Sequence, residues 1–316
     1  MQKDRIALLR QKIEDSLCSE VDRDYVFLDL PFHPNVGDTL IAIASFEFLK
    51  TTRHKCLYYS SPGTFDYHSI SEDTLIIFNG GGNFGDLWKE YYTDFRNKIL
   101  KMYPDNHFLV LPQSVYYLDE KNLEEDVRIF ASCPNVTICA RDMASYEFLR
   151  EHFVKNRIKL VPDMAFYLPQ KYLVGKENGG KVLFLKRKDK EFIPNSKYNI
   201  VPNDAEIRDW PTMEKLAKIH RYYLFINKRI NKIGHPKWLF YIENKVWKSC
   251  ILPYYLRNGI RFVNSYDTIY TTRLHVAILG FLLEKRVFFF DNSYGKNSAL
   301  YNTWLKDSDR INLISE

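Results

Sequence analysis

The sequence lacks any long apolar run: no stretch approaches the roughly 20 apolar residues of a membrane-spanning helix. The opening MQKDRIALLRQKIEDSL has neither the apolar core nor the small-residue cleavage site of a signal peptide, and it is typical of an amphipathic helix. The five cysteines form no CxxC pair and show no zinc spacing. We therefore expect a cytoplasmic protein with reduced core thiols, no metal and no tightly bound cofactor.

Charge is modest and unevenly placed. The 316 residues carry a formal net charge of +6, yet the segment from Lys218 to Arg261 holds ten lysines or arginines and one acid, Glu243. The rest of the chain is therefore slightly acidic. Hydrophobic residues make up 46% of the chain, which is enough for a sizeable core in one large or two ordinary domains.

Short apolar stretches alternate with helical patterns along the chain. Such strands, apolar without alternation and separated by helices, predict parallel sheets covered on both faces. We expect strands at 24–30, 55–60, 74–78, 107–111, 136–140, 181–186, 260–263 and 286–291. We expect helices at 39–50, 88–102, 120–131, 142–152, after Pro211, at 274–284 and at 297–306.

The segment 167–181 interrupts this alternation with a proline, three glycines and few apolar residues. We place a domain boundary there. The predicted architecture is two doubly wound α/β domains, residues 1–170 and 171–316, facing each other across a central cleft. Ligands should bind at the carboxyl ends of the strands.

The motif NVGD, residues 35–38, follows the first expected strand. Gly37 permits a tight turn, and Asp38 can cap the next helix. A cap alone would explain Asp38 equally well. Because the motif lies where a ligand crevice belongs, Asn35 and Asp38 are also candidates to face a ligand.

The glycine cluster NGGGNFGD, residues 79–86, matches the G-x-G-x-x-G sequence pattern of dinucleotide-binding sites, but its structural context does not match theirs. It follows the third strand rather than the first, it would place the anion Asp86 at a helix start, and no Walker lysine accompanies it. Amide and carboxylate side chains beside glycines instead suit a polyhydroxylated ligand such as a sugar. The candidate contacts are Asn79, Gly81, Gly82, Asn83 and Asp86.

The motif TTRLH, residues 271–275, begins another expected helix. Thr271 or Thr272 can cap it, which leaves Arg273 and His275 in a first turn where cations are disfavoured. An anion bound between them would explain both residues. Alternatively, Arg273 pairs with an acid such as Asp267, and His275 is only buried.

Two further cations lie at candidate ligand positions. Arg187 stands at the carboxyl end of the strand 181–186, and Lys296 follows the strand 286–291. For Lys296, an ordinary solvated lysine is the alternative.

Several motifs occur in an order that resembles the polysaccharide pyruvyltransferase family. They are NVGDTLI, NGGGNFGDLW, LPQS with Gln113, ARDMASYEFL, PDMAF and TTRLHVAIL. The resemblance covers about Asn35 to Lys296 and departs most at 193–260. It implies a fold similar to GT-B glycosyltransferases, with two facing Rossmann-like halves. It also implies transfer of pyruvate from phosphoenolpyruvate to a sugar as a ketal, in bacterial capsule or exopolysaccharide synthesis.

By this resemblance, the donor phosphoenolpyruvate is a co-substrate bound by Arg187, Arg273, Leu274 and His275 in the second domain, with Lys296 as an added cation. A histidine suits proton transfer to the donor's methylene carbon near neutral pH. We therefore predict His275 as the acid and Asp86 or Asp38 as the base. The acceptor sugar would face the first domain. The predicted acceptor contacts are Asn35, Asn79, Gly81, Gly82, Asn83 and Gln113.

The basic aromatic segment 227–262 leaves two interpretations open. Trp and Tyr interleaved with Lys and Arg are typical of an interfacial membrane element. Because acceptors in capsule assembly are typically lipid-linked oligosaccharides, docking at the cytoplasmic face of the inner membrane would be sensible. A core helix with a solvated basic face is the alternative. Nucleic acid is disfavoured because no nucleic-acid motif accompanies the patch.

Two other functions compete with pyruvyl transfer. A glycosyltransferase of the same shape would use a nucleotide sugar, but no clear acid follows a strand that could face a ribose. A non-catalytic partner in polysaccharide assembly could also keep this fold. The presence of Arg273, His275, Asp38 and Asp86 favours an enzyme.

Overall fold

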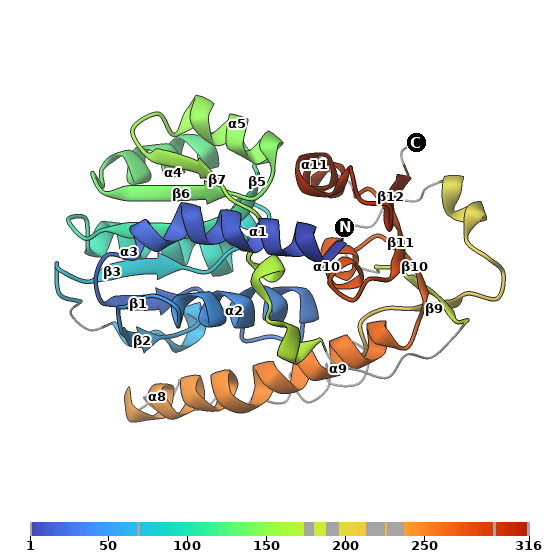
Figure 1. The fold of residues 1–316 in the computed structure, drawn as a ribbon. Coiled ribbons are helices and arrows are strands. Elements are labelled where there is room, and N and C mark those ends of the chain that lie inside the picture. The colour runs from blue at the N-terminus through green and yellow to red at the C-terminus, as the bar shows by residue number, and fades with distance from the viewer. Residues whose placement is uncertain are drawn as a thin grey trace.

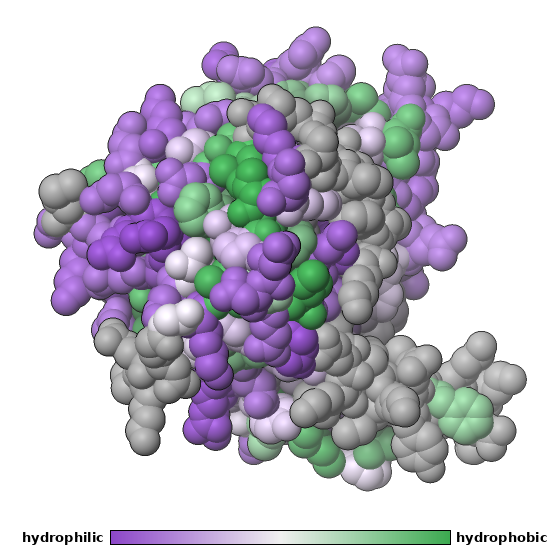
Figure 2. Space-filling view, turned by 90° about the vertical axis from the view of Figure 1, so that its right-hand side faces the viewer, coloured by the Kyte–Doolittle hydropathy of each residue, from purple (hydrophilic) through white to green (hydrophobic). Residues whose placement is uncertain are grey.

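The computed structural model describes residues 2–67, 70–173, 180–187, 196–212, 225, 237–292 and 295–314. Two parallel β-sheets lie side by side with helices packed around them (Figure 1). The prediction of an α/β fold with parallel sheets is therefore confirmed. Seen from the side of the second sheet, the surface is mainly hydrophilic, with a few separate apolar patches (Figure 2).

The first sheet has seven strands in the order β2-β1-β3-β5-β6-β7, with β4 paired to β5. Strands β1 and β3 are buried along their whole length, which explains their unbroken apolar sequence. The strands are β1 (Tyr25–Leu28), β2 (Cys56–Tyr59), β3 (Leu75–Phe78), β4 (Gly81–Gly85), β5 (Phe108–Tyr116), β6 (Val136–Ala140) and β7 (Arg157–Leu160). The accompanying helices are α1 (Gln2–Leu17), α2 (Val36–Leu49), α3 (Asp94–Met102), α4 (Glu120–Ala131) and α5 (Met143–His152).

The second sheet has five strands in the order β12-β11-β10-β8-β9. They are β8 (Val182–Leu185), β9 (Glu206–Arg208), β10 (Thr268–Thr271), β11 (Arg286–Phe290) and β12 (Ile311–Ile314). The helices here are α8 (Lys237–Val246), α9 (Leu252–Asn264), α10 (Leu274–Leu282) and α11 (Lys296–Leu300). Every strand of the first sheet precedes residue 170 and every strand of the second follows it, while the domain boundary itself stays a prediction.

Helix α1 joins the two halves. Its apolar face is buried, as its sequence predicts, and the helix begins beside α10 and runs across the first sheet (Figure 1). Near its start, the side-chain amide of Gln2 donates to the carbonyl of Phe281 at 2.7 Å, and Arg5 donates to the carbonyl of Trp304 at 3.1 Å. One apolar cluster contains buried residues from both halves, so the two sheets share a core.

Several local predictions were wrong. Residues 260–263, expected as a strand, lie inside α9, because their apolar residues belong to a longer amphipathic helix. The side chain that caps α2 is Asn35, whose Oδ1 accepts from the amide of Gly37 at 2.9 Å, while Asp38 lies in the first turn. By contrast, the helix expected at 88–102 is present, as a π-helical turn, Lys89–Thr93, that continues into α3.

Other predictions fall partly outside the described residues or hold only in part. The helix expected after Pro211 lies mostly outside them. Of the five cysteines, all of them free, Cys133 and Cys139 are buried, whereas Cys18 and Cys250 are exposed. Within the described ranges, no helix combines the length and the apolar character needed to cross a membrane.

Candidate active site

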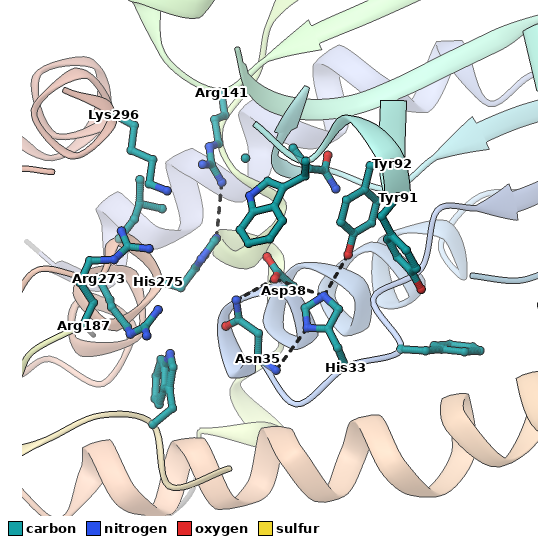
Figure 3. A pocket seen from close by; sticks show the side chains of 16 residues that line it. His33, Asn35, Asp38, Tyr91, Tyr92, Arg141, Arg187, Arg273, His275 and Lys296 are labelled. Carbon is teal, nitrogen blue, oxygen red and sulfur yellow. Dashed lines mark hydrogen bonds and ion pairs between the residues drawn. The ribbon is translucent and has the colours of Figure 1, made fainter. Parts of the chain in front are cut away.

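A cavity of about 460 Å³ lies between the two sheets, where the carboxyl ends of their strands face each other (Figure 3). This is the position at which doubly wound folds bind their ligands. The described residues that line it are Phe32, His33, Asn35, Asp38, Gly82, Asn83, Trp88, Tyr91, Tyr92, Arg141, Arg187, Trp210, Arg273, Leu274, His275 and Lys296.

One side of the cavity gathers cations, and we name it the cationic wall. Its members are Arg141, Arg187, Arg273, His275 and Lys296. Arg141, Arg187 and Arg273 are only 1%, 5% and 8% exposed. Buried guanidinium groups need anionic partners, and Arg273 and Arg141 have buried carboxylates, Asp209 and Asp163, behind them. The structure thus brings together all the residues predicted for the donor, and it adds Arg141.

Arg273 precedes α10 and forms a two-pronged ion pair with Asp209. Its Nε and Nη2 donate to the two carboxylate oxygens at 2.7 and 2.8 Å. The alternative of an acidic partner for Arg273 is therefore correct in kind, but the acid is Asp209 rather than Asp267. Asp209 follows β9, a strand that the sequence did not indicate. The pair fixes the guanidinium at the edge of the cavity.

His275 lies in the first turn of α10, between the carboxylate of Asp163 and the guanidinium of Arg141. Its Nε2 is 3.5 Å from Oδ2 of Asp163 and 3.5 Å from Nη1 of Arg141. Arg141 in turn donates to Oδ2 of Asp163 at 2.8 Å. Burial alone would raise the pKa of Asp163, but hydrogen bonding from His275 and the charge of Arg141 outweigh it and lower that pKa to about 2. Asp163 is thus a fixed anion that orients both groups.

Gly37 has a role that the sequence did not reveal. It lies within α2 rather than in a turn, and a Cβ at this position would lie 2.5 Å from Nδ1 of His275. Only glycine lets the imidazole pack this closely on α2. The motifs NVGD and TTRLH, more than 230 residues apart, therefore meet at one contact.

The opposite side of the cavity combines aromatic rings with a histidine and a carboxylate. We name it the aromatic wall. Its members are Phe32, His33, Asp38, Trp88, Tyr91 and Tyr92. Trp88 and Tyr91 are each 43% exposed, so their rings are available to a ligand. Exposed aromatic faces beside polar groups suit an amphipathic ligand such as a sugar ring.

Hydrogen bonds define the state of His33. The backbone amide of Asn35 donates to its Nδ1 at 3.4 Å, which leaves the proton on Nε2, 2.9 Å from the hydroxyl of Tyr92. Burial lowers the pKa of His33, and the charge of Asp38 opposes this only in part. His33 is therefore neutral near pH 7, next to Asp38, whose Oδ2 accepts from the side-chain amide of Asn35 at 2.7 Å.

The glycine loop contributes Gly82 and Asn83 to the cavity. A Cβ on Gly82 would lie 3.0 Å from Nη2 of Arg141 and 3.9 Å from Nζ of Lys296, so the backbone approaches the cationic wall closely here. Buried Arg96 donates to the side-chain oxygen of Asn83 at 2.6 Å, which orients the Asn83 amide so that its NH₂ is the group left for a ligand.

Three predicted acceptor contacts, Asn79, Gly81 and Gln113, are not among the residues that line the cavity. Asn79 and Gln113 are buried, and the side chain of Gln113 donates to the carbonyl of Asn79 at 2.7 Å. Gly81 pairs with Gln113 where β4 meets β5. At Gly85, with φ of 111°, a Cβ would lie 1.9 Å from the carbonyl oxygen of Tyr116. Gly85 therefore allows β4 to approach β5 rather than a ligand.

Asp86 is the main correction. Its carboxylate accepts from the backbone amides of Leu118 and Asp119 at 2.8 to 2.9 Å and from the side chain of Asn122 at 3.2 Å. These bonds hold the loop before α4, away from the cavity. The prediction of Asp86 as the base is not supported, and Asp38 is the predicted carboxylate that lines the cavity.

Sequence reasoning missed several residues that line or support the site. They are His33, Trp88, Tyr91, Tyr92, Arg141, Trp210, Asp163 and Asp209. Arg141 was available in the motif ARDMASYEFL, at the end of an expected strand, and Asp163 in PDMAF. Within the described part of the chain, no three His, Cys, Asp or Glu side chains gather in a way that could hold a metal ion.

Comparison with known proteins gives a consistent result. The profile of the polysaccharide pyruvyl transferase family matches residues 35–294. EpsO of Bacillus subtilis, whose name describes it as a pyruvyl transferase, is 33% identical over 92% of this chain and 88% of its own. Pyruvyl transferase 1 of Schizosaccharomyces pombe is 33% identical over 45% of this chain and 37% of its own.

A solved structure supports the fold alone. The crystal structure of an uncharacterised protein from Klebsiella pneumoniae superposes with a TM-score of 0.65 at 22% sequence identity. The match covers 98% of this chain and 99% of that one.

Proposed function

The chain belongs to the polysaccharide pyruvyl transferase family and is a transferase, and from this premise we propose that it moves pyruvate from phosphoenolpyruvate onto two hydroxyls of a glycan. The product would be a pyruvate ketal and inorganic phosphate, made in capsular or exopolysaccharide synthesis. The observation that carries the proposal is the cationic wall facing Asp38 across one cavity.

The cationic wall suits a donor with two anionic groups. Phosphoenolpyruvate carries a phosphate and a carboxylate, and arginine can bind either with two parallel hydrogen bonds. Arg187 and Arg273 come from the second sheet, Arg141 from the first, and Lys296 from the start of α11. Leu274, which is 3% exposed, adds an apolar contact beside them. The wall can hold both anionic groups and keep the methylene carbon near His275.

The chemistry begins with a proton from His275 to the methylene carbon of the donor, which becomes a methyl group. The neighbouring carbon gains oxocarbenium character, and a sugar hydroxyl forms a bond to it. The carbon–oxygen bond to phosphate then breaks, and a second hydroxyl of the acceptor closes the ketal. One hydroxyl proton replaces the proton lost by His275, and the other leaves with phosphate, so atoms and charges balance.

Asp38 is the proposed base for the first hydroxyl. Asn35 donates to Oδ2 of Asp38, and Nε2 of His33 lies 3.5 Å from the same oxygen, so Oδ1 can address the acceptor. A neutral His33 suits this role because a charged imidazolium would lower the proton affinity of the carboxylate. Asn83 and the ring of Trp88 would orient the sugar.

The acceptor is proposed to be a lipid-linked oligosaccharide, used at the cytoplasmic face of the inner membrane. This part rests on the composition of the segment 227–262 and on the family description, which names a polysaccharide.

A direct assay distinguishes pyruvyl transfer from glycosyl transfer. Purified protein is incubated with phosphoenolpyruvate and galactosyl- or mannosyl-type acceptors, and phosphate release is followed, with a nucleotide sugar in a parallel reaction. We expect phosphate release that depends on the acceptor. Release of nucleotide from the nucleotide sugar, with phosphoenolpyruvate untouched, would instead identify a glycosyltransferase.

A further inference from the structure

The described part of the basic aromatic segment is a long helical element formed by α8, the π-helical turn Trp247–Ile251, and α9. Its position is fixed by contacts with the first half of the chain. The ring of Trp247, 2% exposed, stacks on Phe32 with centroids 4.8 Å apart and planes at 4°. Buried Asn244 accepts a hydrogen bond from Thr64 at 2.5 Å. The core-helix interpretation is thus correct for one face of this element.

The opposite face of α8 is apolar and open to solvent. Trp238 and Tyr241 are each 62% exposed, Ile242 is 47% exposed and Val246 is 44% exposed. Their spacing of three and four residues places them on one side of the helix.

Basic residues continue this exposed face. Lys245 on α8, and Arg257 and Arg261 on α9, are all exposed, whereas Glu243 is the only acid between residues 237 and 262 and is half-buried. We define the exposed stripe as Trp238, Tyr241, Ile242, Lys245, Val246, Tyr254, Arg257 and Arg261. Aromatic and aliphatic side chains beside an excess of basic ones match the boundary between acyl chains and anionic headgroups.

We propose that the exposed stripe docks the enzyme on an anionic lipid bilayer, with the helix axis parallel to the membrane plane. Trp238, Tyr241 and Ile242 would enter the headgroup boundary, and Arg257 and Arg261 would contact anionic headgroups. Charge complementarity selects this occupant over a second copy of the chain, because two copies of the stripe would bring like charges together.

The helical element that carries the exposed stripe lies next to the aromatic wall of the cavity. Phe32, a member of the aromatic wall, stacks on Trp247, so the aromatic wall is in direct contact with this helical element. The sugar end of a lipid-linked acceptor would therefore enter on the acceptor side while its lipid stays in the bilayer. This account of how the acceptor enters rests on the proposed function, whereas the docking on a bilayer does not.

Flotation with vesicles tests the docking without any substrate. Protein is mixed with phosphatidylcholine vesicles or with vesicles containing about 30% phosphatidylglycerol, at low and high salt. We expect binding to the anionic vesicles at low salt and a loss at high salt. Because each basic residue near the surface contributes about 1 kcal/mol, the double variant R257E/R261E should lower the partition coefficient at least ~20-fold.

Variants of the apolar part separate insertion from simple charge attraction. Trp238→Ala with Tyr241→Ala should lower binding about tenfold or more, since each removes a large exposed ring that docking would bury in the bilayer. Val154→Ala, at a position 74% exposed and far along the chain, is the matched control and should bind as the parent does. All of these positions are exposed, so the variants should fold, which circular dichroism would check.

Two outcomes would overturn the docking proposal. One is equal flotation of parent and stripe variants. The other is a dimer by light scattering that the Trp238 variant turns into a monomer, which would make the stripe an interface between copies. Pyruvyl transfer to a short soluble acceptor should be the same in parent and stripe variants. If that transfer is absent from both while vesicle binding is intact, the proposed function fails and the docking stands.

Discussion

The two walls of the cavity differ in how the chain builds them. The cationic wall holds buried charges whose positions depend on buried carboxylates behind them, Asp209 for Arg273 and Asp163 for Arg141. The aromatic wall has partly exposed rings and one carboxylate held by neutral partners. The first suits tight, geometrically fixed binding of a small dianion, and the second suits a larger polyhydroxylated ligand. Under the proposed function, each substrate would have a wall of matching chemistry.

The largest effect is expected at His275, which we place as the proton donor to the methylene carbon. His275→Ala should lower kcat by ~10²–10⁴-fold, the usual contribution of a general acid. Phosphate release under saturating donor would measure it. His54→Ala, in the turn before β2, is the control and should keep full activity. Full activity of the His275 variant with intact folding would remove this residue from the mechanism.

The two aspartates predicted as bases should now behave differently. Asp38→Asn should lower kcat about 100-fold, because the amide cannot accept the hydroxyl proton. Asp86→Asn should change kcat by less than about threefold and cost about 1 kcal/mol of stability, since it only weakens bonds to the loop before α4. Steady-state kinetics and thermal unfolding of both variants would measure this contrast. A larger kinetic loss at Asp86 than at Asp38 would reverse the assignment.

The contact between the two halves can be broken with one methyl group. Gly37→Ala should displace the His275 ring and lower kcat by ~10²-fold, because small misplacements of a catalytic group are costly. Gly63→Ala is a matched control, since its nearest neighbours would lie 3.9 Å away. An unchanged rate in Gly37→Ala would mean that the ring has room to move without loss of function.

Substitution of Arg273 tests whether the cationic wall binds the donor. Arg273→Met should raise the KM for phosphoenolpyruvate about 10- to 100-fold, because it removes charged hydrogen bonds to the ligand. It should also destabilise the fold by about 3–5 kcal/mol, since buried Asp209 loses its two-pronged ion pair. The double variant with Asp209→Asn should recover much of the stability but not the KM. Recovery of both would make the pair purely structural.

The smallest effect concerns pH and His33. Its folded pKa is lowered below the ordinary 6.5, so its contribution to stability is present above pH 6.5 and is lost as pH falls through the folded value. Once protonated, His33 can no longer accept from Asn35, and it weakens Asp38 as a base. The acid limb of kcat/KM should therefore lie below pH 6.5.

His33→Gln should abolish this acid limb and lower the rate about fivefold, the value of one hydrogen bond. An acid limb at the same pH in the variant would assign it to another group.

The sequence predicted the alternation of elements, the parallel sheets and most of the cationic wall, because these depend on local patterns. Arg273 and His275 were found because cations at the start of a helix need an explanation. The pairings Arg273–Asp209 and Arg141–Asp163 could not be found, since nothing local marks which acid lies beside which base. Trp88 and Tyr91 are aromatic residues in an aromatic-rich chain, so composition alone did not distinguish wall from core. The assignment of Asp86 to the site failed because its partners come from another loop.

The most direct test of pyruvate ketal formation is the reaction carried out in D₂O with phosphoenolpyruvate and a glycan acceptor, followed by NMR of the product. Protonation of the methylene carbon followed by ketal closure predicts a product methyl group carrying one deuterium, with one phosphate released per ketal. A product that keeps an intact methylene group would show enolpyruvyl transfer without ketal formation. That result, or release of no phosphate with any glycan, would contradict the central claim.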